Sequence, residues 1–304
     1  MKSQPYKKLN KAVSPVLVIV LLLLGIFPAC AQLNPFQTMY FQNKYIYNPA
    51  MAGLEKGLSL DLDYMQQWSS FPGTPRTESF TADFQPVNKV GIGLNVNNDQ
   101  AGLIKSTRVM GTYAYHLPLS DNNEHLSFGV SLGINDSRVN YNDINGDVTD
   151  QELAQYNQLK PYVDGDFGIA YTNNRFYIGS ALPNIRSAFF KSSDQRFDAD
   201  RLLYIVAASY KFPLQAEGGG FVLEPTAAYR VVKGYSNIFD VGFNFAMNNY
   251  GIYFQTIYHT SQSMGLGFGL DQHTYGINFS YDLVTSALSN YVNGTFALGL
   301  KVKL

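Results

Sequence analysis

Long segments that alternate apolar with small or polar residues constrain this chain more than any other feature. The alternation is clearest in one stretch, where Phe239, Val241, Phe243, Phe245 and Met247 are separated by Asp240, Gly242, Asn244 and Ala246. A period of two predicts β-strands with two different faces. Such segments, of about 10 to 13 residues, exceed the usual soluble strand and approach the length that crosses a bilayer. Tyr and Phe recur at the segment ends, where membrane barrels carry aromatic girdles.

The alternating segments predict an all-β, antiparallel up-and-down transmembrane barrel of about 14 strands. We place them at 57–67, 77–86, 89–98, 105–118, 124–135, 163–173, 175–183, 202–213, 219–231, 236–247, 249–259, 262–271, 273–282 and 293–304. An even count is what bacterial single-chain barrels have. Connections after even-numbered segments are short, and the long ones follow odd-numbered segments. Short turns on the periplasmic side and long loops outside have this parity when both termini are periplasmic.

Composition and the last segment favour the same fold. Charged residues are 15% and aromatic residues 14% of the 304-residue chain, against ~25% charged residues in soluble domains. The net charge of -1 argues against nucleic-acid binding, which needs clustered Lys and Arg. Mean hydropathy is -0.11, which argues against a helical membrane protein. Outer-membrane barrels end in an amphipathic strand, as 293–304 does, although Leu304 stands where an aromatic residue is usual.

The first 31 residues have the three parts of a cleaved signal peptide. Basic residues come first, the apolar run 16–27 follows, and Ala29-Cys30-Ala31 supplies the small residues of a cleavage site. Two alternatives remain: a transmembrane anchor, for which the run is short, and lipidation of Cys30, for which the preceding residues are a poor context. We expect residues 32–56 to form a periplasmic segment that plugs the lumen or meets partners, and 57–304 to form the barrel.

An ordered series of short motifs runs through the mature chain. It begins with "YNPAMAG" at 47–53, whose Asn, Pro and Gly suit a turn, and continues with "QQW" at 66–68. The later members are "SFTADFQP" at 79–86, "GIGLNVNNDQAG" at 91–102, "GTYAYHLPL" at 111–119 and "DFGIAYTNNRFYIGSALPN" at 166–184. The series resembles the PorP/SprF family of outer-membrane proteins of the Bacteroidetes type IX secretion system.

The resemblance implies a barrel protein, not an enzyme, that helps secrete or attach large adhesins and other cargo with a type IX C-terminal domain. Some family members associate with periplasmic secretion and gliding machinery. The residues that match the family elements, which we assign to structure and partner docking, are Asn48, Pro49, Ala50, Gly53, Gln67, Trp68, Pro75, Asp99 and Gly102. Trp68 is either an interfacial anchor or an aromatic contact for cargo.

The predicted inward face carries charges of both signs. They are Asp61, Asp63, Asp83, Arg108, Asp166, Glu224, Arg230, Asp240, Asp282, Lys301 and Lys303. A mixed interior can pair its charges across the lumen and fits a packed or plugged barrel, although a wet porin lumen tolerates it too. A ring of one sign would instead have indicated an ion filter.

Three candidate sites for other chemistry are weak. Asp143, Asn145, Asp147 and Thr149 have the spacing of a calcium loop, but Val148 and Ala154 stand where such a loop has Gly and Glu, so a solvated loop is favoured. The four histidines, His116, His125, His259 and His273, form no zinc motif or triad. "GLGFGL" at 265–270 alternates like a strand and not like a phosphate loop.

The leading hypothesis is therefore a non-enzymatic barrel, integral to the outer membrane of a Gram-negative bacterium. It would bind type IX cargo, and possible contacts include periplasmic machinery subunits; we expect no cofactor, metal, nucleic acid or small-molecule substrate. The outer loops 136–162 and 184–201 and the rim 68–76 would contact cargo. The alternative is a porin or fatty-acid transport channel. An outer-membrane lipase or protease would need a Ser/His/Asp motif that the sequence does not show.

Overall fold

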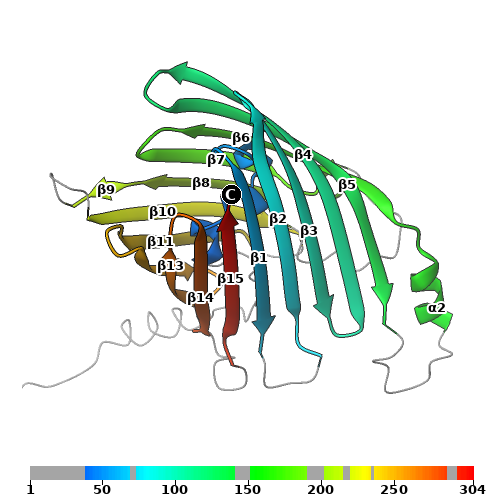
Figure 1. Cartoon of the computed structure of the whole chain (residues 1–304). Coiled ribbons are helices and arrows are strands. Elements are labelled where there is room, and N and C mark those ends of the chain that lie inside the picture. The colour runs from blue at the N-terminus through cyan, green and yellow to red at the C-terminus, as the bar shows by residue number, and fades with distance from the viewer. Residues whose placement is uncertain are drawn as a thin grey trace, which may run out of the picture. The chain divides into compact units, whose positions relative to one another are not determined.

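A closed antiparallel barrel of 14 strands forms the wall of the molecule (Figure 1). The computed structural model describes residues 38–68, 73–140, 151–189, 202–214, 220–233, 236–285 and 293–304. The barrel closes because the first strand, β1 (Leu58–Gln67), pairs with both β2 (Arg76–Val87) and the last strand, β15 (Thr295–Lys303). Ser59 thus lies opposite Lys303, and Gln67 lies opposite Thr295. Closure leaves no unpaired sheet edge, and a lipid environment requires that every strand be paired.

The strand positions confirm the predicted number and order. They are β1 Leu58–Gln67, β2 Arg76–Val87, β3 Val90–Ala101, β4 Ile104–Ser120, β5 Glu124–Val139, β6 Tyr162–Thr172, β7 Phe176–Leu182, β8 Leu202–Tyr210, β9 Phe212–Pro213, β10 Phe221–Val232, β11 Ile238–Met247, β12 Ile252–His259, β13 Ser263–Asp271, β14 Tyr275–Val284 and β15 Thr295–Lys303. Both β8 and the two-residue β9 pair with β10. They are two parts of one wall strand, interrupted at Lys211, and this interruption explains fifteen labels for 14 strands.

Short helical turns complete the fold. In the described part of the chain, three 3-10 turns precede the barrel: η1 Thr38–Phe41, η2 Lys44–Ile46 and η3 Pro49–Met51. The same part contains two α-helices, α2 Gln151–Gln158 and α3 Ile185–Phe189, which follow β5 and β7. Among the described residues, no helix has both the length and the apolar character needed to cross a membrane.

The polarity of the two faces of the wall is the reverse of that in a soluble protein, because apolar side chains face outward and polar side chains face inward. Along β13, Met264, Leu266 and Phe268 point outward and are 37%, 47% and 42% exposed. The residues between them are glycines, which are buried on the inside. Elsewhere the buried inward side chains are mostly Ser, Thr, Asn and charged residues. An apolar exterior around a polar interior is what a membrane-spanning barrel needs.

The two ends of the barrel differ in their connections. The ends of the wall meet where Leu58 N donates to Leu304 O at 2.8 Å, and the turns at this end, such as 121–123, are short. We name it the short-turn end. The opposite end carries the connections 140–161, 183–201 and 285–294, and we name it the long-loop end. The parity predicted from the sequence is therefore the parity of the structure.

The outward face gives a first prediction. Leu132 lies near the middle of β5 and is 66% exposed, so Leu132→Arg puts a charge at the centre of the apolar band. We expect this change to lower the free energy of unfolding in lipid vesicles by about 2–4 kcal/mol. Leu119→Arg, near the short-turn end of β4, is the control and should cost under about 1 kcal/mol. Equal costs at the two positions would mean that β5 does not cross the apolar band as described.

Candidate functional site

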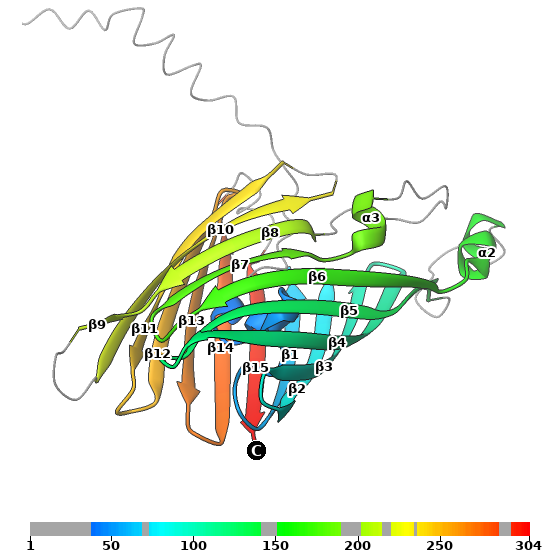
Figure 2. The ribbon, with the colours of Figure 1, turned by 90° about the horizontal axis from the view of Figure 1, so that it is seen from above.

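The lumen of the barrel holds the chain's own residues 38–57, which we name the lumenal segment (Figure 2). Its first turn, η1, lies against β12, β13 and β14, and its last turn, η3, lies against β4, β5 and β6. The segment thus reaches opposite sides of the wall. It includes the described part of 32–56, which we expected either to plug the lumen or to meet partners.

The Asn-Pro element of the lumenal segment ties it to two wall strands. Asn48 caps η3, where its Oδ1 accepts a hydrogen bond from Ala50 N at 3.0 Å, and Pro49 occupies the first helical position. Asn48 Nδ2 donates to the backbone oxygens of Ile169 on β6, at 3.2 Å, and Ser180 on β7, at 3.5 Å. One side chain therefore shapes the turn and fastens it to the wall.

Two glycines of the wall make room for this turn. A Cβ on Gly129 of β5 would lie under 3.0 Å from backbone atoms of Pro49 and Ala50. A Cβ on Gly168 of β6 would lie under 3.0 Å from the Asn48 side chain. The small inward residues that the alternation placed inside the barrel are thus the surface on which the lumenal segment packs.

Polar side chains of the lumenal segment anchor it at other points of the wall. Asn43 Nδ2 donates to Thr81 Oγ1, and Tyr45 OH donates to Thr112 Oγ1, each at 2.7 Å. Gly53, whose φ of 61° suits glycine, donates from its N to Asp83 Oδ2 at 2.7 Å. Because buried polar groups must find partners, these bonds select one position for the segment.

Lys44 makes the one ion pair between the lumenal segment and β10 among the described residues. Its Nζ lies 3.1 Å from Glu224 Oε1, which also accepts from Ser209 Oγ at 2.7 Å. The ammonium stands over the Tyr177 ring, 4.4 Å from its centre. Burial lowers the pKa of Lys44, while Glu224 acts in the opposite direction and favours the charged form.

A buried charged cluster lies toward the long-loop end. Arg230 Nε and Nη2 donate to the two oxygens of Asp240 at 2.6 and 2.9 Å. His259 Nδ1 lies 2.6 Å from Asp240 Oδ1. The Asp282 side chain lies over Gly265, so a Cβ added to Gly265 would be 2.5 Å from Asp282 Oδ1. Arg230, Asp240 and His259 are 1%, 1% and 0% exposed.

The structure places all eleven predicted lumenal charges on the inward face of their strands. The list of these residues is Asp61, Asp63, Asp83, Arg108, Asp166, Glu224, Arg230, Asp240, Asp282, Lys301 and Lys303. Several pair with the opposite sign, as Arg108 Nη2 does with Asp166 Oδ1 at 2.6 Å, and Lys301 Nζ with Asp61 Oδ1 at 3.8 Å. Lys303 Nζ lies 3.5 Å from Glu55 Oε2 of the lumenal segment.

The residues assigned to partner docking fall into two separate groups. Asn48, Pro49, Ala50 and Gly53 are buried in the lumen, and their contacts are with the wall. This group therefore offers no surface to another protein while the lumenal segment is docked.

The second group lies at the long-loop end. Gln67 N donates to Pro75 O at 2.9 Å, and Trp68 N donates to Gly294 O at 3.2 Å. Asp99 Oδ1 accepts from Thr77 Oγ1 at 2.6 Å on the neighbouring strand, and Gly102 N donates to Gly73 O at 3.0 Å. These five residues shape one stretch of the rim around β1 to β4.

Sequence reasoning missed the side chains that fix the lumenal segment, above all Asn43, Lys44 and Tyr45. The available signal was the glycine-rich inward face of β5 and β6, since glycine there marks close approach of another backbone. Some predictions fall outside the described residues. These are the signal peptide 1–31, the calcium-like positions Asp143, Asn145, Asp147 and Thr149, and parts of the loops 136–162, 184–201 and 68–76.

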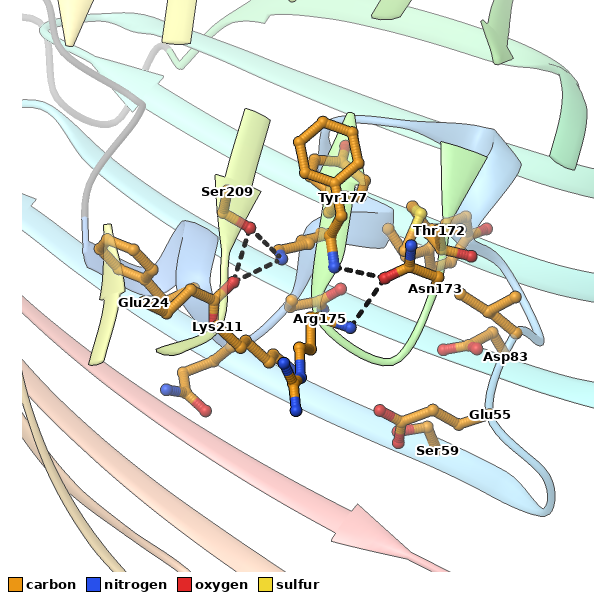
Figure 3. Close-up of a pocket in the computed structure, with 18 of the residues that line it drawn as sticks. Glu55, Ser59, Asp83, Thr172, Asn173, Arg175, Tyr177, Ser209, Lys211 and Glu224 are labelled. Atoms are coloured by element: carbon orange, nitrogen blue, oxygen red, sulfur yellow. Dashed lines mark hydrogen bonds and ion pairs between the residues drawn. The ribbon is translucent and has the colours of Figure 1, made fainter. Parts of the chain in front are cut away.

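A cavity of about 230 Å³ opens between the lumenal segment and the wall at the short-turn end (Figure 3). Its lining includes Lys44 and Glu55 from the lumenal segment. The wall contributes Arg175 from the β6–β7 turn, Lys211 from the β8–β9 interruption, and Glu224. The cavity is therefore polar and mixed in charge.

The comparison with one solved structure, Omp33, supports the fold. Omp33 of Acinetobacter baumannii matches 83% of this chain and 100% of its own at a TM-score of 0.50 and 8% identity. The Pseudomonas putida toluene transporter TodX matches 86% of this chain and 92% of its own, at a TM-score of 0.46 and 8% identity. The KdgM porin matches 81% of this chain and 99% of its own, at a TM-score of 0.41 and 8% identity. At these identities the likeness concerns the fold alone.

Sequence comparison identifies the family. No curated protein matches the chain. The profile of the family described as "Type IX secretion system membrane protein PorP/SprF" matches residues 29–302, almost the whole chain. The chain is thus an integral outer-membrane β-barrel, and it belongs to the PorP/SprF family of type IX secretion system membrane proteins.

Proposed function

We propose that this barrel is a non-enzymatic partner or anchor for type IX cargo, such as adhesins and other proteins with a type IX C-terminal domain. Membership of the PorP/SprF family associates the chain with the secretion machinery in general. The observation that carries the proposal is the lumenal segment. A lumen occupied by buried, hydrogen-bonded residues of the chain itself leaves recognition to the two ends of the barrel.

The long-loop end is where cargo would bind. In outer-membrane barrels the long loops face outward, and here this end bears α2, α3 and the rim with Trp68 and Pro75. The short-turn end would face the periplasm and its machinery subunits. A closed barrel has no free strand edge to offer a partner, so side chains and loops must carry the recognition.

A porin or fatty-acid channel is the alternative function. It needs a continuous path or an apolar pocket through the lumen. The lumenal segment stands in that path and contacts β4 to β6 on one side and β12 to β14 on the other. The inward face is small and polar, which does not suit a fatty acid. Both points favour a binding scaffold over a channel.

The test is to extract the tagged barrel gently from native outer membranes and identify what co-purifies by mass spectrometry. We expect a large secreted protein with a type IX C-terminal domain. If the barrel repeatedly comes out alone, even after crosslinking, and conducts ions in planar bilayers, the channel function replaces our proposal.

A loop replacement locates the cargo contact. Residues 141–154 can be exchanged for a short Gly-Ser linker without cutting into β5 or β6. This exchange retains Asn157, whose side chain pairs with Val139 N and O at 2.7 and 3.1 Å. We expect cargo recovery to fall by about tenfold, as expected for loss of about 1.4 kcal/mol of binding free energy. Exchange of the short-turn-end residues 121–123 is the control and should leave recovery unchanged; equal losses would place the cargo contact elsewhere.

A further inference from the structure

The cavity at the short-turn end is bounded by two parts of the chain that are distant in sequence. Residues 41–45, Leu54 and Glu55 of the lumenal segment form one side. The wall side includes Tyr177 of β7, and Arg175 and Lys211, which lie close together in Figure 3. Lys211 N donates to Arg175 O at 2.7 Å, which holds the two residues next to each other. The cavity opens at the short-turn end, which faces the periplasm in the proposed orientation.

Every carboxylate in the cavity already has a donor. Glu224 accepts from Lys44 and Ser209, at 3.1 and 2.7 Å. Asp83 accepts from Gly53 N at 2.7 Å, and Glu55 lies 3.5 Å from Lys303 Nζ.

The two outer cations of the cavity, Arg175 and Lys211, differ from its carboxylates in having no partner for their side chains in the described part of the chain. Arg175 and Lys211 are exposed, and among the described residues neither side chain has an acceptor. The Arg175 backbone N is held by Asn173 Oδ1 at 2.8 Å, which fixes the base of the side chain. A cavity whose acids are satisfied and whose two outer cations have no hydrogen-bond acceptor presents surplus hydrogen-bond donors and positive charge. That is the chemistry that receives carboxylates, because arginine and lysine form charge-assisted bonds with them.

We propose that this cavity binds an acidic segment of a periplasmic protein, with carboxylates received by Arg175 and Lys211. The volume of about 230 Å³ admits individual side chains and not a folded domain or a whole lipid. Asn173 lines the same cavity, and its Oδ1 is already bonded to Arg175 N and Phe176 N, at 2.8 and 2.6 Å. The residues just before the lumenal segment, "QLNPFQ" at 32–37, are poor occupants of the cavity because they contain no acid. The inference rests on the proposed function only in taking the partner to be a component of the secretion machinery.

The test measures binding of fluorescein-labelled hexaglutamate to the purified full chain in detergent micelles by fluorescence polarisation. We expect saturable binding that weakens as salt rises, since exposed charges are screened. In Arg175→Glu/Lys211→Glu the affinity should fall by at least about tenfold, because two charge-assisted bonds are replaced by repulsion. The control, Lys56→Glu/Lys89→Glu, changes the net charge of the chain by the same amount. Both of its residues are exposed at the same end of the barrel and do not line the cavity. It should bind hexaglutamate within about twofold of the unmodified chain.

Competition separates the sources of negative charge. Unlabelled hexaglutamate should displace the probe, and hexaglutamine should not. Displacement by equimolar inorganic phosphate would overturn the peptide assignment in favour of a small-anion site. Equal weakening in the two double variants, or the absence of salt-sensitive binding, would overturn the site itself. Retention of the folded form on unheated gels shows that both variants are intact barrels.

Failure of this inference is distinguishable from failure of the proposed function. Cargo recovery from the outer membrane does not depend on the hexaglutamate assay. If cargo co-purifies but hexaglutamate does not bind, only the periplasmic site is wrong. If hexaglutamate binds at Arg175 and Lys211 but no cargo is found, only the proposed cargo function is wrong.

Discussion

Valine at both Gly129 and Gly168 is expected to drive the lumenal segment out of the barrel and open a conducting path. Each new side chain would overlap the turn formed by Asn48, Pro49 and Ala50. Overpacking costs about 1–3 kcal/mol per site, so the two changes together shift the docked equilibrium by about thirtyfold or more. Two readouts report this: ion conductance in planar bilayers, and trypsin cleavage after Lys44, which is shielded while Lys44 pairs with Glu224.

The matched control is Gly111→Val. Gly111 lies on β4, is exposed on the outward face, and a Cβ there has only Leu132 O nearby, at 3.8 Å. The conductance of Gly111→Val and its rate of cleavage after Lys44 should equal those of the unmodified chain. If Gly129→Val/Gly168→Val stays closed and resists cleavage while folded, then the glycines do not govern docking of the lumenal segment.

Removing Arg230 should destabilise the barrel more than any other single change considered for this wall. Arg230→Ala takes away the two Arg230 donors to Asp240, at 2.6 and 2.9 Å, and the cation that faces Asp282. It leaves His259 as the neighbour of Asp240. Breaking a buried pair by removing one partner leaves an uncompensated charge and costs about 3–5 kcal/mol. Urea-induced unfolding in lipid vesicles, followed by tryptophan emission of Trp68, would measure this loss.

An exposed ion pair provides the control for Arg230→Ala. Arg138 Nε lies 3.0 Å from Asp136 Oδ2, and the two side chains are 48% and 34% exposed. Arg138→Ala should therefore cost about 0–1 kcal/mol, as is usual for solvent-exposed pairs. Comparable losses for the two variants would show that water reaches the Arg230 cluster.

The wall was predictable from the sequence because its signal is local. Alternation over ten residues fixes which side chains of a strand face inward, as in β13 and β14, and the parity of turn lengths is an independent check on the number of strands. The interior contacts were not predictable in this way. Lys44 and Glu224 are 180 residues apart, and Lys301 and Gln42 are 259 apart. Only the closed barrel brings them together, and no local pattern marks Asn43 or Tyr45 as anchors.

The position of the lumenal segment has a consequence for the order of assembly. The segment joins β1 at the short-turn end. It precedes the whole wall in synthesis, yet its docking surface on β12 to β14 comes from the last quarter of the chain. Docking must therefore wait for contacts of very large sequence separation, which form late. We therefore expect each newly inserted barrel to have an undocked lumenal segment until these last contacts form.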